Sequence, residues 1–186
     1  ALADTIRPES KATIQRLRES GIEHIVMLSG DNQGTAEAIG REAGIDEIRA
    51  NLLPADKVTA ISDLVARYKS VAMVGDGIND APALSLATLG IAMGAAGSDT
   101  AMEAADVALM SDDLSKLPWL VEHSRRMLGI IRVNIVLSLA VKGVFVALTM
   151  LGHASLWAAI AADMGMSLLV IFNALRLLRD RDPKAI

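Results

Sequence analysis

The stretch V-G-D-G-I-N-D-A-P-A-L, residues 74–84, places two carboxylates in a glycine-rich loop between a short apolar run and a helical pattern. The glycines on either side of Asp76 let a cation approach its carboxylate without steric obstruction. Mg²⁺ favours oxygen ligands, usually one or two carboxylates together with waters and a phosphate oxygen. A simple turn uses the same residue types, but the length and position of this string favour a ligand site. We therefore predict that Asp76 and Asp80 bind Mg²⁺, with Asn79 as a neutral hydrogen-bonding partner.

Around this stretch, short apolar runs alternate with helical patterns throughout residues 1–128. The repeat of strand, loop and helix predicts an α/β domain whose parallel sheet is covered on both faces. In such sheets the ligand site lies at the carboxyl ends of the strands. We therefore expect the loops at 29–32 and 75–80 to meet at the ends of neighbouring strands. The predicted strands are 22–28, 70–74, 90–93 and 107–110, and the predicted helices are 10–20, 33–43, 56–68, 81–87 and 100–105.

Two other segments carry residues suited to a phosphoryl group. Ser29, Gly30 and Asp31 supply a hydroxyl, a closely approachable backbone and a third carboxylate, and hydroxyl and backbone N–H groups are suitable donors to phosphate. Lys57 opens a predicted helix and supplies the positive charge that phosphoryl transfer needs. Taken alone, the first segment also fits a turn with a helix cap, and most lysines are simply solvated.

The second part of the chain is nearly continuous apolar sequence. Residues 130–151 and 156–178 are each a little over 20 residues long, enough to cross a hydrocarbon core of about 30 Å as a helix. Basic residues flank the outer ends of the pair, and the connection at 152–155 is short and uncharged. The positive-inside rule then places both ends in the cytoplasm. We predict a transmembrane hairpin over 129–180 and a cytoplasmic tail at 181–186, in preference to two buried helices of a soluble protein.

Lys142 and Asp163 are the only charged residues deep inside these spans. At 1.5 Å per residue they lie about 13 Å and about 10 Å from the helix ends that adjoin the connecting loop, so a hairpin places them at similar depth. An intramembrane charge costs at least about 2.5 kcal/mol and usually faces a partner or an ion path. Two interpretations follow: a structural ion pair, or a site in which Asp163 binds a divalent ion and Lys142 is the counter-charge.

Composition excludes several classes of function. The chain has no cysteine, so it contains neither a disulfide framework nor a thiolate metal site. Its formal net charge of −4 gives no reason to expect a nucleic-acid partner. Because the sequence begins without an initiator Met or a signal peptide pattern, we expect it to start inside a longer protein.

Three motifs, S-G-D at 29–31, P-x-x-K at 54–57 and G-D-G-x-N-D-x-P at 75–82, resemble in order and spacing those of the P-type ATPases. The phosphorylation domain of that family has the haloacid-dehalogenase fold. The resemblance implies that the first loop and the lysine contact the phosphoryl group, that the third loop holds Mg²⁺, and that ATP binds mainly to domains outside this chain. Ser29 stands where the family usually has Thr, and the hydroxyl is kept.

The hairpin resembles the Zn²⁺/Cd²⁺/Pb²⁺ branch of the heavy-metal pumps, through V-K-G at 141–143, A-D-M-G at 162–165 and N-A-L-R-L at 173–177. The Met and Ser ligands of the copper branch and the His-Glu pair of the cobalt type are not seen. The resemblance implies export of these ions across the plasma or inner membrane through an aspartyl phosphate, with lipid and the other pump domains as partners. One carboxylate and one lysine do not discriminate among the three metals.

The D-K-T-G sequence that carries the phosphorylated aspartate of the family does not occur here. Covalent catalysis needs that nucleophile. We therefore expect this chain alone neither to form a phosphoenzyme nor to turn over ATP. Two alternatives remain: a phosphatase-like hydrolase of the same fold, and a membrane-anchored, non-catalytic module that binds phosphate or Mg²⁺.

Overall fold

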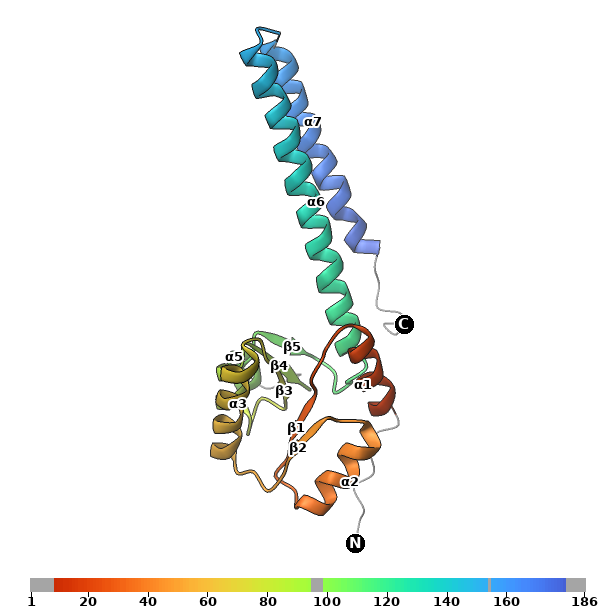
Figure 1. Cartoon of the computed structure of the whole chain (residues 1–186), viewed down its shortest axis with the longest axis vertical. Helices are drawn as coiled ribbons and strands as arrows, with labels where there is room; N and C mark the ends of the chain where they lie inside the picture. The colour runs from red at the N-terminus through yellow and green to blue at the C-terminus, as the bar shows by residue number, and fades with distance from the viewer. Residues whose placement is uncertain (1–8, 95–98, 154, 180–186) are drawn as a thin grey trace. The chain divides into compact units, whose positions relative to one another are not determined.

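The computed structural model describes residues 9–94, 99–153 and 155–179, and the chain divides into two compact units, 1–118 and 119–186 (Figure 1). The division falls ten residues before the predicted boundary at 128. Its cause is a long helix that begins at Lys116, although the apolar run within it begins only at residue 130. Composition therefore marks where the charges stop, not where the helix starts. The predicted tail at 181–186 lies outside the described residues.

The first unit alternates strands and helices, and every strand pairing in it is parallel. This confirms the predicted α/β class. The elements are α1 (Ser10–Glu19), β1 (Val26–Leu28), α2 (Gln33–Ala43), β2 (Glu47–Arg49), α3 (Pro54–Tyr68), β3 (Ala72–Gly75), α4 (Ala81–Leu86), β4 (Leu89–Met93), α5 (Asp99–Ala104) and β5 (Val107–Leu109).

The order of the strands differs from the prediction. Pairing forms two sheets, β1-β2 and β3-β4-β5, so the expectation that the strands before the two acidic loops are neighbours is wrong. The sequence pattern missed β2, which pairs with β1 in the register Met27 to Ile48. Ile48 is the only apolar residue of its three-residue strand, so no apolar run in the sequence indicates this strand. Within the described residues, β1 and β3 each pair along one edge only.

The first strand is also shorter than the predicted 22–28. Ile25 lies just outside the ladder because its backbone binds Asp46: its N–H donates to Asp46 Oδ2 at 2.9 Å, and its carbonyl accepts from the N–H of Asp46 at 3.1 Å. A side chain thus takes the place of a ladder partner, and the strand begins at Val26.

The two sheets share one hydrophobic core. Helix α3 contributes Ile61 and Leu64, and β3 contributes Met73. Val26 and Leu28 of β1 pack against the same cluster. Burial of these apolar side chains is the main force that holds the strands of both sheets around α3.

Asp46 provides a test of pH-dependent stability. Arg18 Nη2 donates to Asp46 Oδ1 and to the carbonyl of Gly44, both at 2.7 Å. The hydrogen bond from Arg18 and that from the N–H of Ile25 lower the pKa of Asp46 below its ordinary value. Because the folded pKa is depressed, this stabilisation is present above the unfolded pKa of about 3.9 and is lost as the pH falls through the folded pKa.

We expect Asp46→Asn to lower the free energy of unfolding by about 1 kcal/mol at pH 7, a value discounted for solvent screening because Asp46 is 35% exposed. The difference from the parent chain should shrink as the pH falls below about 3.9. Urea unfolding of the chain in detergent at several pH values measures it. A difference that stays constant down to about pH 2.5 would contradict the assignment.

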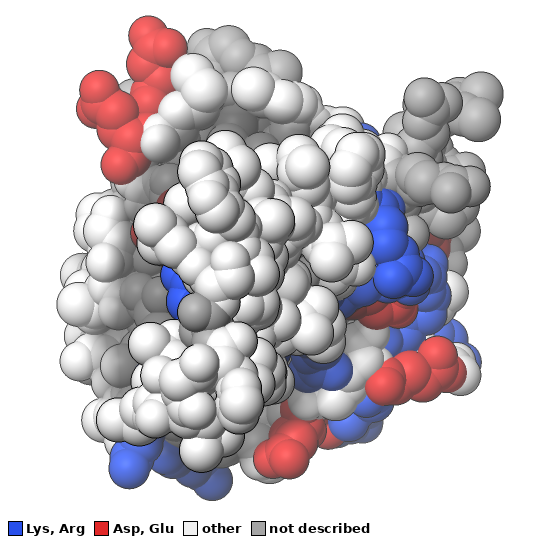
Figure 2. Space-filling model, turned by 90° about the horizontal axis from the view of Figure 1, so that it is seen from above, with Lys and Arg blue, Asp and Glu red and all other residues white. Residues whose placement is uncertain are grey.

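The second unit consists of two long helices, α6 (Lys116–Met150) and α7 (Leu156–Leu175), followed by a 3₁₀ turn, η1 (Arg176–Arg179). Both helices are long and apolar enough to cross a membrane, and almost none of their apolar stretches is buried. The end of the hairpin seen in Figure 2 is white, so neither basic nor acidic side chains gather there. Helices of a soluble core are mostly buried, and these are not.

Candidate functional site

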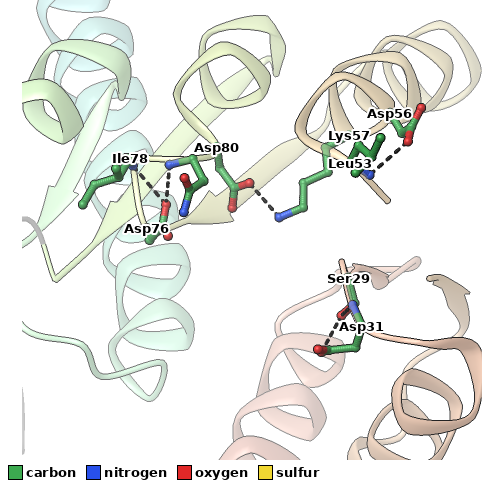
Figure 3. Close-up of polar contacts among 9 residues, drawn as sticks. Ser29, Asp31, Leu53, Asp56, Lys57, Asp76, Ile78 and Asp80 are labelled. Atoms are coloured by element: carbon green, nitrogen blue, oxygen red, sulfur yellow. Dashed lines mark hydrogen bonds and ion pairs between the residues drawn. The ribbon is translucent and has the colours of Figure 1, made fainter. Parts of the chain in front are cut away.

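The acidic loop after β3 is wrapped around one oxygen of Asp76. Asp76 Oδ1 accepts from the backbone N–H groups of Ile78 at 2.9 Å and Asn79 at 3.2 Å (Figure 3). Among the described residues, no hydrogen bond engages Oδ2, and an ionised carboxylate accepts at both oxygens. The loop therefore fixes Asp76 while leaving one oxygen for a ligand.

Two glycines allow this loop to be so compact. A Cβ added at Gly75 would lie 2.9 Å from Asp80 Oδ2, so the absence of a side chain lets Asp80 approach the end of β3. Gly77 has φ +74°, and a Cβ there would lie 2.3 Å from the Cβ of Ala101 in α5. Helix α5 thus closes directly over the loop.

Gly77→Ala should destabilise the first unit more than Gly44→Ala. Gly44 has nearly the same φ, +78°, but open space where its Cβ would be. Both variants incur the left-handed backbone penalty of about 1–2 kcal/mol, and only Gly77→Ala adds overpacking against Ala101, a further cost of about 1–3 kcal/mol. Urea unfolding of the two variants measures the difference. Equal losses would show that α5 does not pack on the loop.

Lys57 forms an ion pair with the second carboxylate of the loop. Its Nζ lies 2.7 Å from Asp80 Oδ1, and the two side chains are only 19% and 13% exposed. Lys57 stands in the first turn of α3, which begins at Pro54 and is capped by Asp56 Oδ2 accepting from the N–H of Leu53 at 2.9 Å. The cap and the proline fix where α3 begins, and so direct Lys57 to the end of β3.

The loop after β1 is closed by its own hydrogen bonds. Ser29 Oγ donates to Asp31 Oδ2 at 2.8 Å and accepts from the N–H of Asp31 at 3.1 Å (Figure 3). The backbones of Asn51 and Leu52 donate to the carbonyls of Asp31 and Ser29, so this loop lies beside the segment that leads into α3. Gly30 approaches that segment closely, with a Cβ position 3.4 Å from the carbonyl oxygen of Leu52.

The structure therefore brings together some of the predicted site residues. Lys57 contacts Asp80 directly, and Asp76 contacts the backbone of Asn79. Over the described residues, no hydrogen bond or ion pair joins Ser29 or Asp31 to that group. In the part of the chain that the structure describes, the loop after β1 and the loop after β3 are connected through α3 and the shared core.

The donor chemistry around Asp76 fits Mg²⁺. Asp80 lies against the backbone of the same strand end, at Gly75, so a second carboxylate is present at the end of β3. The described residues contain no group of three or more His, Cys, Asp or Glu placed to bind a metal. Mg²⁺ commonly needs only one or two carboxylates and takes its other ligands from water and phosphate. A site of this kind favours Mg²⁺ bound together with a phosphoryl group.

In the second unit, Lys142 and Asp163 face one another across the two helices. Lys142 Nζ lies 3.7 Å from Asp163 Oδ1, which confirms that the two residues share a depth in the hairpin. Both side chains are more than half exposed, at 63% and 65%. They border a cavity of ≈ 300 Å³ whose other lining residues are Ser138, Val141, Phe145, Val146, Ala159, Ala162 and Met166.

A second polar contact between these helices was not predicted. Asn173 Nδ2 donates to Asn134 Oδ1 at 2.7 Å, and Arg176 Nη1 lies 3.5 Å from Asn173 Oδ1. The available signal was spacing: Asn134 precedes Lys142 by eight residues and Asn173 follows Asp163 by ten, which is compatible with two contacts in one antiparallel pair.

The parallel strands and the carboxylate loop at the end of β3 define a haloacid dehalogenase-like domain. The family model for haloacid dehalogenase-like hydrolases matches residues 1–88. The chain is 55% identical over 182 residues to a probable cadmium-transporting ATPase of Listeria monocytogenes, covering 98% of this chain and 26% of that protein. It is 46% identical to the zinc/cadmium/lead-transporting P-type ATPase of Escherichia coli, covering 97% of this chain and 24% of that protein.

The crystal structure of a zinc-transporting PIB-type ATPase in its E2.Pi state superposes with a TM-score of 0.86 at 46% identity, covering 95% of this chain and 28% of that one. The chain belongs to the heavy-metal-transporting P-type ATPases. It spans about a quarter of the length of these relatives.

Proposed function

We propose that this chain forms part of an ATP-driven pump that exports Zn²⁺, Cd²⁺ or Pb²⁺ through an aspartyl-phosphate intermediate. The observation that carries the proposal is the Lys142–Asp163 pair between two apolar helices, in the same chain as the Asp76–Asp80 loop. The relatives named for cadmium and zinc transport support the choice of cargo. The ATPase activity and the cargo belong to the whole pump.

Each residue of the phosphoryl site has a separate task in this proposal. Asp76 and Asp80 hold Mg²⁺, with Asn79 fixing the loop around Asp76. Lys57 places positive charge next to the phosphoryl oxygens, and Ser29 with Gly30 and Asp31 binds them from the loop after β1. Bound Mg²⁺ supplies neutralisation of the charge that develops on the phosphoryl group.

The nucleophile of this proposal is an aspartate outside the sequence, because D-K-T-G does not occur in it. Within the described residues, β1 and β3 each pair along one edge only, and a parallel edge accepts a further strand. A strand that paired with both would end beside the loops that start at Ser29 and Asp76. The split of the sheet thus supports a nucleophile delivered by another segment of the pump.

The hairpin has its own role in the proposal. Asp163 binds the metal ion while the ion is in the membrane, and Lys142 pairs with Asp163 once the ion has left, which hinders its return. The contact of 3.7 Å fits the metal-free pairing. The pair lies at a depth where a lone charge is costly. Because Asp163 exchanges the metal ion for Lys142, its negative charge always has a positive partner.

The same proposal places the chain in the cell membrane, with lipid and the other helices of the pump around α6 and α7. The basic residues at the outer ends of the hairpin favour a cytoplasmic position for both ends. The first unit then also lies in the cytoplasm, where ATP is available.

The 186-residue chain by itself should acquire no acid-stable label from [γ-³²P]ATP, with or without Zn²⁺, whereas the full-length protein should be labelled in the presence of Mg²⁺ and Zn²⁺. The reason is the missing nucleophile. Covalent label on the chain alone would refute this division of roles. Hydrolysis of a phosphomonoester such as p-nitrophenyl phosphate by the chain alone would favour the phosphatase alternative.

A further inference from the structure

We infer that Asn134 and Asn173 form a clasp, meaning the hydrogen bond between their side chains, that fixes the register of α6 against α7 and thereby holds Lys142 opposite Asp163. The clasp stands on the geometry of the hairpin, and its effect on transport rests on the proposed function. Asn134 and Asn173 are positioning residues in this account, not metal ligands.

The direction of the clasp follows from the donors and acceptors around it. Arg176 has donors but no acceptor, so the oxygen of Asn173 faces Arg176 at 3.5 Å. The amide nitrogen of Asn173 then points to Asn134 and donates to its oxygen at 2.7 Å. Orientation of an amide is decided by such partners, and the arginine fixes it here.

The clasp matters because the other contacts between α6 and α7 would allow one helix to slide along the other. The residues that line the cavity between the two helices are mostly apolar, such as Val141, Phe145 and Ala162, and lipid solvates such side chains as well as a neighbouring helix does. Polar contacts between membrane helices contribute about 0.6–1.7 kcal/mol. A slip of one helical turn, about 5.4 Å, would leave the apolar surfaces covered but would separate Lys142 from Asp163.

The clasp and the ion pair lie at two points along the same pair of helices, so together they fix how the helices are aligned. Asn134 and Lys142 lie about 12 Å apart along α6, and Asp163 and Asn173 about 15 Å apart along α7. Around the axis of each helix the two residues are about 80° apart, so they lie on the same side of that helix. Two contacts at this separation define both the depth and the rotation of one helix against the other. With a single contact, one helix could still turn about that point.

Disulfide trapping tests the register directly, because the chain has no cysteine of its own. Val146 and Ala159 line the cavity beside Lys142 and Asp163, so the Val146→Cys/Ala159→Cys pair reports the native register. The Met150→Cys/Ala159→Cys pair, one turn further along α6, reports a slipped one. Both are oxidised in the 186-residue chain in phospholipid vesicles.

Asn134→Leu and Asn173→Leu should each lower the ratio of native to slipped cross-linking by about threefold to twentyfold, the fold-change that corresponds to the loss of one such contact. Asn134→Asp keeps an acceptor for the amide N–H of Asn173 and should retain the parent ratio, whereas Asn134→Leu offers neither an acceptor nor a donor. Thr149→Val is the matched control, since Thr149 Oγ1 donates to Phe145 within the same helix.

The functional readout is the Zn²⁺ concentration that gives half-maximal ATP hydrolysis by the full-length pump. It should rise by about threefold to twentyfold in Asn134→Leu and stay at the parent value in Asn134→Asp. An unchanged cross-linking ratio in Asn134→Leu, or a ratio in Asn134→Asp as low as that in Asn134→Leu, would overturn the clasp. Absence of Zn²⁺-stimulated hydrolysis in the parent pump would instead refute the proposed function, and the cross-linking ratio would still decide the clasp.

Discussion

Asp163→Ala in the full-length pump is expected to reduce Zn²⁺-stimulated ATP hydrolysis by at least about 100-fold, a loss at the upper end of that seen when only an outer partner of a ligand is removed. Asp163 lines the cavity between α6 and α7, and its carboxylate faces the ammonium of Lys142. Its removal deletes the proposed ligand and leaves Lys142 uncompensated at membrane depth. Hydrolysis in membranes, with and without Zn²⁺, is the measurement.

Met164→Leu is the matched control for that variant, since it changes the next residue of the same helix at nearly constant volume and should preserve activity. Lys142→Ala separates the two roles of the pair: metal binding should be partly retained, while release or coupling is impaired. Unchanged Zn²⁺ stimulation in Asp163→Ala would remove Asp163 from the transport path. Parent-like transport by Lys142→Ala would refute the counter-charge role.

Asp76→Asn should reduce phosphorylation of the full-length pump from ATP by about 10³-fold, comparable to the loss of a preorganised electrostatic group. The substitution is isosteric, and the amide oxygen can still accept from the N–H groups of Ile78 and Asn79. The loop therefore keeps its shape while the charge that binds Mg²⁺ is lost. Acid-stable labelling as a function of Mg²⁺ concentration measures the effect.

Asp63→Asn is the control for charge alone, because Asp63 pairs with Arg49 on the surface of α3 and is 62% exposed. It should leave labelling unchanged. If Asp76→Asn and Asp63→Asn were labelled equally, Asp76 would have no role in binding Mg²⁺.

The acidic loop and most of the elements could be predicted because their signals are local. The helix at 33–43 is predicted at its observed bounds, since Asn32 caps it and Gly44 ends it with φ +78°. The pairing of Lys142 with Asp163 could be predicted because helix rise alone fixes depth. These inferences need no knowledge of which strand lies beside which.

Strand order could not be obtained in this way. The strand centred on Ile48 has charged residues on both sides, and its place beside β1 depends on Asp46, which binds Arg18 and the backbone of Ile25. These contacts join residues more than twenty positions apart. The hydrogen bond between Asn134 and Asn173 is also a long-range contact. An asparagine in an apolar helix does not by itself show which residue it binds.

Labelling the full-length protein from both directions decides whether one chain carries both a phosphoryl site and a separate metal site of a pump. The measurement is acid-stable ³²P incorporation from ATP with Mg²⁺ and Zn²⁺, and from inorganic phosphate with Mg²⁺ and no Zn²⁺. The account predicts that Asp163→Ala loses labelling from ATP but keeps labelling from phosphate, whereas Asp76→Asn loses both. Labelling of Asp76→Asn from phosphate at the parent level, or full Zn²⁺-dependent labelling of Asp163→Ala from ATP, would contradict it.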